Sequence, residues 1–254
     1  MFVTIRAKRL FCALLVIVAF ALALTMTSAS GSAEVFFGAP RKIPIYSVDV
    51  KEKRVALTFD AAYGADKTSA IMDVLEDEGI PATFFLVGFW VRNFPEKAKE
   101  IADRGFEIGT HSNVHGHMSK MTSEEIASDL GLSIERIREA TGITPTVFRA
   151  PYGEYNDRLI TEAGRLGLMT VQWSVDSLDW KNISAQSVVE RVCTKAHEGA
   201  IILMHNNSDY VVEALPEIIQ RLKKEGYTFS TVGDMILRDN YYVDNSGRQH
   251  LKNP

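Results

Sequence analysis

The sequence is poor in cysteine and has no excess of positive charge. Its 254 residues include 2 cysteines, too few for a disulfide-stapled scaffold. The formal net charge is −4, whereas a protein that tracks the phosphates of nucleic acid is expected to be basic, so we expect no nucleic-acid partner. With 17 glycines and 8 prolines the chain is not collagen-like. What is present, 46% hydrophobic and 24% charged residues, is typical of a folded globular protein.

The first 33 residues have the layout of an export signal. Basic residues precede an uncharged apolar run from Leu10 to Met26, and small residues follow as far as Ala33. This pattern favours a signal peptide cleaved after Ala33. An uncleaved membrane anchor is the alternative, because a run of about 17 residues is near the minimum for a membrane span. We therefore expect an exported protein, secreted to the cell wall or anchored by this segment, which would be its only membrane contact.

Removal of residues 1–33 leaves a net charge of −7 and a single cysteine, Cys193. A lone thiol forms no internal disulfide, and its place in a helical pattern predicts a small buried side chain. We divide the remaining chain into a leader at 34–53, a domain at 54–238 and a loose polar tail at 239–254.

Short apolar runs alternate with helical patterns along residues 54–238. The predicted strands are Arg54–Asp60, Thr83–Val87, Glu107–Thr110, Val147–Arg149, Met169–Trp173, Ala200–Met204 and Tyr227–Thr231. The predicted helices are Lys67–Glu78, Glu96–Asp103, Ser123–Thr141, Asp157–Leu166, Ala185–His197 and Tyr210–Lys224. Such alternation predicts an α/β protein with parallel strands and helical crossovers. Seven or eight units in so short a chain favour a compact β/α barrel.

Polar side chains recur at the predicted carboxyl ends of the strands. Catalytic groups of β/α barrels lie at that end. Each residue alone has an ordinary explanation: a turn carboxylate, a surface cation or a half-buried histidine. Their recurrence at the same end of successive strands indicates a functional site, and the residues concerned are Asp60, His111, Arg149, Asp176, Asp179 and His205.

Two histidines, His111 and His115, are four residues apart. On a helical turn this spacing places both imidazoles on one face, where they can share a divalent metal. The alternative is a pair of solvated loop histidines. His117 is out of phase with the pair, so we expect it to be a solvated loop residue.

Five ordered segments resemble the motifs of polysaccharide deacetylases, the NodB-homology group of carbohydrate esterase family 4. The resemblance extends from about Lys53 to Leu237 and implies a distorted (β/α) barrel of seven or eight units. It also implies a divalent metal, usually zinc with cobalt as an alternative, and removal of N-acetyl groups from chitin-like glycans or peptidoglycan. The run from Ile45 to Gly64 resembles the sporulation-associated branch in particular. The five segments are Thr58-Phe59-Asp60, His111-Ser112-Asn113-Val114-His115, Arg149-Ala150-Pro151-Tyr152, Asp176-Ser177-Leu178-Asp179-Trp180 and Leu203-Met204-His205.

The resemblance also implies roles for individual residues. His111 and His115 would hold the metal, which lowers the pKa of bound water. Asp60 would be the general base and Arg149 would orient it. Tyr152 would belong to the site that binds the N-acetylated glycan, where its backbone N–H would stabilise the oxyanion.

On the leaving-group side, His205 would be the general acid, held by Asp179, because a carboxylate-paired imidazolium supplies a proton near neutral pH. Trp180 and Leu203 would line the slot for the acetyl methyl group. The resemblance leaves the particular glycan and the oligomeric state open.

One position departs from the family pattern. The usual first motif has two adjacent aspartates, a base and a metal ligand, but here Asp60 is followed by Ala61. Asp66 could supply the missing ligand from the loop, Asp60 itself could bind, or water could complete the shell. An uncompensated ion would acidify its water more strongly but bind less tightly.

Two other functions compete with deacetylation. Without the carboxylate ligand, the barrel could bind a glycan without turning it over. A different C–N hydrolase on the same barrel, acting on a small amide or cyclic imide, is the second competitor. Retention of Asp60, His111, His115, Arg149 and His205 favours an enzyme.

Overall fold

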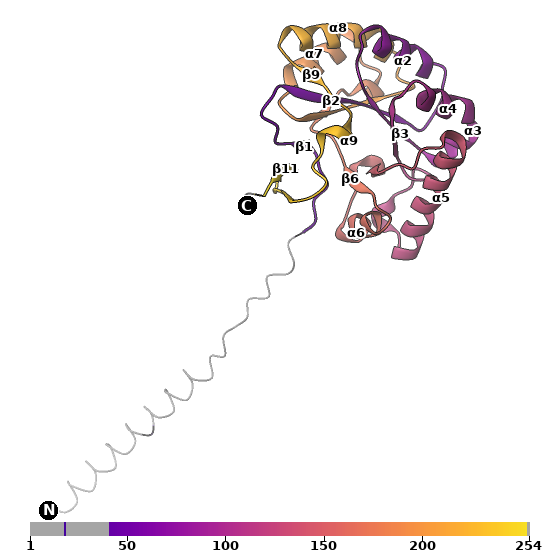
Figure 1. Cartoon of the computed structure of the whole chain (residues 1–254), viewed down its shortest axis with the longest axis vertical. Coiled ribbons are helices and arrows are strands. Elements are labelled where there is room, and N and C mark those ends of the chain that lie inside the picture. The colour runs from indigo at the N-terminus through magenta and orange to yellow at the C-terminus, as the bar shows by residue number, and fades with distance from the viewer. Residues whose placement is uncertain (1–17, 19–40, 253–254) are drawn as a thin grey trace, which may run out of the picture. The chain divides into compact units, whose positions relative to one another are not determined.

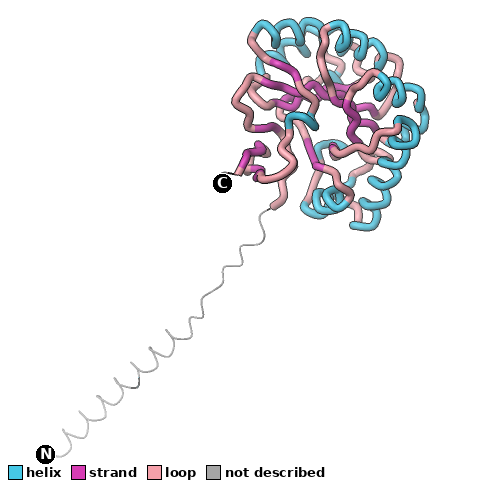
Figure 2. The backbone as a smooth tube through the Cα atoms, viewed as in Figure 1, coloured by secondary structure: helices cyan, strands magenta, loops and turns pink. Residues whose placement is uncertain are grey.

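Strands of residues 41–252 pair into one curled sheet, and helices pack around its outer side (Figures 1 and 2). The computed structural model describes residue 18 and residues 41–252. Apart from Val18, the predicted export segment therefore lies outside the described residues. Within the described part of the chain, no helix has the length and apolar character required to cross a bilayer.

The curled sheet confirms the prediction of an α/β fold with a distorted barrel. Its strands are β1 Ser47–Val48, β2 Arg54–Ala61, β3 Thr83–Leu86, β4 Glu107–Thr110, β5 Val147–Arg149, β6 Met169–Val171, β7 Val175–Asp176, β8 Ala200–His205, β9 Thr228–Phe229, β10 Tyr241–Val243 and β11 Arg248–Leu251. The spatial order is β10-β11-β1-β8-β2-β3-β4-β5-β6. Within it, the neighbouring strands β8, β2, β3, β4, β5 and β6 are parallel. β7 pairs with β8, and β9 pairs with β2.

The predicted helices are present close to their predicted ranges, and two short helices of the described residues, α3 Gly88–Asn93 and α9 Val232–Met235, were not predicted. The predicted ones are α2 Thr68–Asp77, α4 Pro95–Asp103, α5 Ser123–Thr141, α6 Asp157–Arg165, α7 Ala185–Lys195 and α8 Val211–Lys224. Three 3₁₀ turns follow strands: η1 Met118–Lys120, η2 Pro151–Gly153 and η3 Asp179–Lys181. α5 starts at a reciprocal capping box between Thr122 and Glu125. Cys193 on α7 is buried, as expected.

Alternation along β2 directs Asp60 away from the helices. Val55, Leu57 and Phe59 belong to the core between sheet and helices, where all three are fully buried. Because successive strand side chains point to opposite faces, Asp60 points to the interior of the curled sheet. The apolar repeat of β2 thus fixes the direction of this carboxylate.

The segment predicted as a leader closes the barrel, so that prediction is wrong for its described part. Ile45 donates its N–H to the Thr170 carbonyl (3.0 Å) and accepts from the Gln172 N–H (2.7 Å). Two residues further on, Ser47 pairs antiparallel with Ala200 of β8. This short segment therefore joins β6 to β8 across the gap in the parallel sheet.

The tail predicted to be loose is also ordered in the sheet. β10 and β11 form a hairpin, and β11 pairs in parallel with β1. The Gln249 side chain is fully buried and bonds both the N–H and the carbonyl of Leu237, each at 2.8 Å. A polar composition hid this strand because its buried anchor is an amide rather than an apolar residue.

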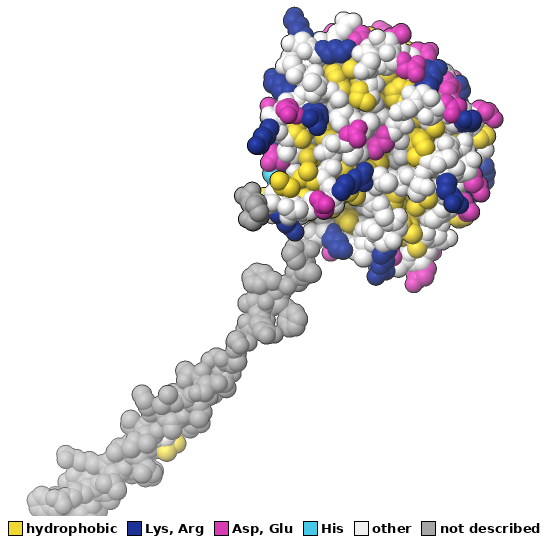
Figure 3. Space-filling view, in the orientation of Figure 1, with side chains coloured by type: hydrophobic (Ala, Val, Ile, Leu, Met, Phe, Trp, Pro, Cys, Tyr) yellow, Lys and Arg dark blue, Asp and Glu magenta, His cyan; other side chains and the backbone are white. Residues whose placement is uncertain are grey.

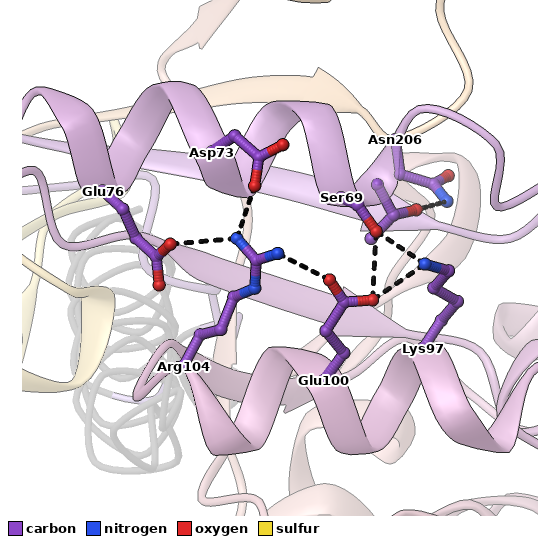
Figure 4. A network of polar contacts seen from close by, with 8 residues as sticks. Ser69, Asp73, Glu76, Lys97, Glu100, Arg104 and Asn206 are labelled. Carbon is purple, nitrogen blue, oxygen red and sulfur yellow. Dashed lines mark hydrogen bonds and ion pairs between the residues drawn. The ribbon is translucent and has the colours of Figure 1, made fainter.

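Ion pairs connect α2 to α4 on the outer layer (Figure 4). Arg104 contacts Asp73 and Glu76 of α2 at 2.7 and 2.9 Å, and Glu100 of α4 at 2.8 Å. Exposed pairs of this kind contribute only about 0–1 kcal/mol each. In the surface view, acidic and basic side chains are interspersed over the visible face of residues 41–252 (Figure 3).

Candidate active site

The predicted site residues meet at one rim of the barrel. Asp60 and His205 are in-register partners near the carboxyl ends of the parallel strands β2 and β8. Arg149 ends β5, and His111 follows β4. The carboxyl ends of parallel strands share one edge, which explains why residues far apart in sequence converge.

A pocket of about 610 Å³ opens at this rim. That volume is in the usual range for small-molecule sites. Arg149 lies beneath it and acts on it through Asp60. The lining includes Asp60, Ala62, Tyr63, His111, His115, Tyr152, Trp173, Asp176, Asp179, Trp180, Leu203 and His205.

Asp60 and Arg149 form a buried ion pair at the base of the pocket. The Arg149 guanidinium donates to Asp60 Oδ1 at 2.6 Å and to the Gln172 carbonyl at 3.2 Å, and it lies over the Phe85 ring. Burial alone would raise the pKa of Asp60, but the charge and hydrogen bond of Arg149, together with His111 and His205, outweigh it and hold that pKa below its usual value. Asp60 is therefore an ionised, oriented acceptor for a proton.

The two predicted metal ligands, His111 and His115, lie side by side, with ring centroids 4.9 Å apart. They do not share a helical turn, as the spacing suggested. Ser112 and His115 both have positive φ (69° and 54°), so a strained loop brings the imidazoles together. The two imidazoles are therefore neighbours through a loop, and the helical turn that the spacing suggested is absent.

The environment of His111 fits a cation. Its Nδ1 donates to the Arg149 carbonyl (2.8 Å), since a carbonyl can only accept. Burial lowers the pKa of His111, so the ring is neutral and Nε2 carries a lone pair. His111 Nε2 lies 3.4 Å from Asp60 Oδ2. A cation between these two electron-rich atoms would stabilise the arrangement.

His115 fits the same ion. Burial and then the neighbouring His111 lower the pKa of His115 to about 4, which leaves it neutral. Its Nδ1 is buried without a hydrogen-bond partner in the described part of the chain. Two neutral imidazoles beside a carboxylate suit a divalent ion with an open coordination shell.

A third ligand is not supplied where the sequence suggested it. Asp66 is exposed and does not line the pocket, so the structure does not bring it to the histidines. Ala61 packs with the core on the helix side of β2. Among the described residues, no three His, Cys, Asp or Glu side chains are grouped to hold a metal ion. Fewer protein ligands mean weaker retention of an ion.

His205 and Asp179 form the opposite side of the pocket. Asp179 is almost fully buried and accepts from both the Nδ1 and the backbone N–H of His205, each at 2.8 Å. Burial of His205 would lower its pKa, but the Asp179 hydrogen bond and charge outweigh this and raise the pKa above its ordinary value. His205 is thus suited to donate a proton near neutral pH.

Exposed aromatic rings border the pocket. Tyr152 and Trp180 are more than half exposed, as a substrate-contacting role requires, while Leu203 is buried in the wall. Tyr63 was missed by the sequence analysis although it follows Asp60 by three residues, and it is 58% exposed beside His115. An aromatic residue close to a motif was the available signal in the sequence.

His117 is an exposed loop residue, as its phase suggested, but its ring has partners. Its ring stacks on Tyr152, with centroids 4.6 Å apart and planes inclined by 23°. Its Nδ1 also lies 3.1 Å from both carboxylate oxygens of Glu154. Spacing along the chain carries no information about a partner 35 residues later, so the sequence could not indicate this contact.

Comparison with known proteins supports the resemblance. Residues 47–171 match the polysaccharide deacetylase family model. The peptidoglycan-N-acetylmuramic acid deacetylase PdaA of Bacillus subtilis is 35% identical, over 75% of this chain and 74% of that protein. The uncharacterized protein YlxY of Bacillus subtilis is 36% identical, over 76% of this chain and 60% of its own length, so the chain spans less than two thirds of that relative.

Solved structures agree with the fold. The structure of BA3943 from Bacillus anthracis, described as a CE4 family pseudoenzyme, superposes with a TM-score of 0.74 at 32% identity. The match covers 82% of this chain and 72% of that one. A mutant of the same protein is described as having restored enzymatic activity. Taken with the barrel and the converging motifs, these matches show that the chain belongs to the polysaccharide deacetylases of carbohydrate esterase family 4, with a NodB domain.

Proposed function

We propose that this chain is a metal-dependent hydrolase that removes N-acetyl groups from peptidoglycan or a similar cell-wall glycan. The observation that carries the proposal is the pairing of Asp60 and His205 on adjacent strands at one pocket, each beside a partner of opposite charge. An ionised carboxylate and a protonated imidazole on two sides of one pocket are the groups that amide hydrolysis needs.

The mechanism follows from these residues. Asp60 accepts the proton of the attacking water, and Arg149 keeps the carboxylate ionised and oriented. His205 donates a proton to the leaving amine while Asp179 stabilises the imidazolium. Leu203 and Trp180 border the space for the acetyl methyl group. The Tyr152 backbone N–H is the proposed donor to the developing oxyanion.

His111 and His115 would hold the metal. When bound there, a divalent ion supplies Lewis-acid activation of water and of the amide carbonyl. Members of the family generally depend on a metal. Zinc suits two imidazoles, and cobalt is the alternative.

The test is acetate release from N-acetylated peptidoglycan and from chitooligosaccharides, with added Zn²⁺ or Co²⁺. We expect Asp60→Asn to lower kcat by about 10²–10⁴, because the proton acceptor is lost while the side-chain volume is kept. Asp66→Asn is the matched control, since this exposed carboxylate lies off the pocket, and it should leave kcat unchanged. Turnover retained in Asp60→Asn would exclude Asp60 as the base.

A glycan-binding protein without turnover is the second candidate. It is favoured by Ala61 in place of a carboxylate ligand and by the likeness to a pseudoenzyme. In that case the protein would bind insoluble peptidoglycan in a sedimentation assay, and added metal would release no acetate. Binding with acetate release supports the enzyme, and binding alone supports this alternative.

Export through residues 1–33 is part of the same proposal, because a cell-wall substrate lies outside the cytoplasm. The basic start and apolar run of the segment support it. N-terminal sequencing of the protein recovered from its native cells decides between cleavage after Ala33 and a retained anchor. Recovery of the intact chain in the soluble cytoplasmic fraction would contradict export.

A further inference from the structure

Two loops at the pocket contain backbone in an unfavourable conformation. Ser112 and His115 in the loop after β4, and Tyr152 in η2 after β5, have φ values of 69°, 54° and 61°. For residues other than glycine this left-handed conformation costs roughly 1–3 kcal/mol each. Such conformations persist only where surrounding contacts hold them.

The strained residues are connected across the two loops. The Tyr152 hydroxyl donates to the His115 carbonyl at 3.1 Å, and the two rings meet edge to face with centroids 4.7 Å apart. On its other side, Tyr152 is covered by the parallel ring of His117. Tyr152 is thus held between a predicted metal ligand and a residue that does not line the pocket.

Glu154 fixes the outer ring of this stack. A carboxylate can only accept, so His117 donates from Nδ1 to Glu154, at 3.1 Å from each oxygen. Ser119 donates to the same carboxylate at 3.1 Å. Glu154 therefore accepts hydrogen bonds from two side chains of the segment after β4. It lies two residues beyond Tyr152 in the segment after β5, so it connects the two.

Further contacts continue the attachment outward. Asn156 donates to the Ser119 carbonyl at 2.7 Å, and Arg158 donates to the Met121 carbonyl at 2.6 Å. The two loops are therefore joined along their length. Among these contacts between the two loops, His117 stacks on Tyr152 and Glu154 holds His117, and both residues lie outside the pocket.

We propose that His117 and Glu154, here called the clamp, are positioning residues that hold Tyr152 and His115 in their reactive placement. The inference rests on the proposed function, in which the Tyr152 N–H faces the oxyanion. An error of about 1 Å in such a group lowers the rate by about 10²-fold, so a contact outside the pocket can affect turnover.

The experiment separates the stacking from the hydrogen bond. His117→Ala removes both, and His117→Phe keeps the ring on Tyr152 but loses the bond to Glu154. Glu154→Gln keeps an acceptor for His117 without the charge. Lys120→Ala, at an exposed position on the same loop, is the control. Acetate release is measured for kcat and KM separately, and hydrogen–deuterium exchange is followed in residues 111–122 and 150–158.

For His117→Ala we expect kcat to fall about tenfold with KM within about twofold, because positioning of the reacting groups is lost and not glycan binding. His117→Phe should recover more than half of kcat, and Glu154→Gln should stay near the unsubstituted protein. Unchanged kcat in His117→Ala, or an equal loss in Lys120→Ala, overturns the proposal.

Failure of the clamp is distinguishable from failure of the proposed function. If the unsubstituted protein releases no acetate, the proposed function fails. The clamp is then tested by hydrogen–deuterium exchange alone. Faster exchange of residues 150–158 in His117→Ala, restored in His117→Phe, then supports positioning of the Tyr152 turn. Equal exchange in all variants overturns it.

Discussion

Asp179 binds His205 through both of its carboxylate oxygens. Oδ1 accepts from the imidazole Nδ1 and Oδ2 accepts from the backbone N–H, each at 2.8 Å. This double contact fixes the tautomer, so that Nε2 is the nitrogen available to the pocket. It also joins the turn η3 to the end of β8, and the acidity of His205 therefore depends on a neighbouring segment.

Removal of the Asp179 charge should shift the pH dependence of turnover. His205 must be protonated to act as an acid, so its raised pKa sets the alkaline limb of kcat/KM. In Asp179→Asn the burial of His205 is no longer outweighed, the pKa falls, and the alkaline limb moves to lower pH. The pH profile of acetate release measures this shift. Asp209→Asn, a pocket-side carboxylate paired with Lys67, is the control, and an unmoved limb in Asp179→Asn contradicts the assignment of His205.

Loss of either pocket histidine should weaken metal binding. His111→Ala and His115→Ala each remove one of the two proposed imidazole ligands, and we expect zinc affinity to fall by at least about tenfold. Isothermal titration with zinc measures this without a glycan. His197→Ala is the matched control, because His197 contacts Ser174 outside the pocket. An equal effect of all three variants would place the zinc elsewhere.

The exposed ring of Tyr63 should contribute to glycan binding. Tyr63→Ala removes an aromatic face at the pocket rim, and stacking worth about 1 kcal/mol predicts a rise in KM of about fivefold with kcat nearly unchanged. Tyr63→Phe keeps the face and should retain the original KM. Steady-state acetate release on oligosaccharides provides both constants. Tyr242 on β10 is similarly exposed, and the same KM change in Tyr242→Ala would show that the effect is not local to the pocket.

The C-terminal hairpin should stabilise the barrel through Gln249. Gln249→Ala leaves the N–H and carbonyl of Leu237 without their side-chain partner, and we expect the free energy of unfolding to fall by about 2 kcal/mol. Urea unfolding followed by fluorescence measures this. The exposed Lys252→Ala should change nothing, and stability equal to the original protein in Gln249→Ala would mean that the hairpin is not part of the cooperative unit.

The barrel was largely predictable because its strands are apolar and regular. The ranges of β4, β5 and α5 agree with the prediction at both ends. Ile45 and Gln249 were missed for a physical reason. Ile45 closes the barrel through a single isolated bridge to Val171, and Gln249 anchors a polar strand by hydrogen bonds. Neither feature produces a periodic apolar pattern in the sequence.

The site was predictable where strand ends determine it. Asp60, Arg149 and His205 follow apolar runs, so the sheet itself positions them. Loop residues were less predictable, because a strained loop obeys no fixed period. The sequence suggested a helical turn for His115 and, among other ligands, Asp66, whereas the loop geometry gives a different answer for both. It placed His117 correctly as an exposed loop residue but did not indicate its contact with Tyr152.

The in-register pairing of Asp60 with His205 also constrains when the site can form. β2 is made early in synthesis and β8 only after most of the chain, yet the two strands are neighbours. A nascent polypeptide that has not yet emerged as far as β8 lacks the second half of its acid–base pair. The proposed acid–base pair can therefore form only after β8 has been made, late in synthesis.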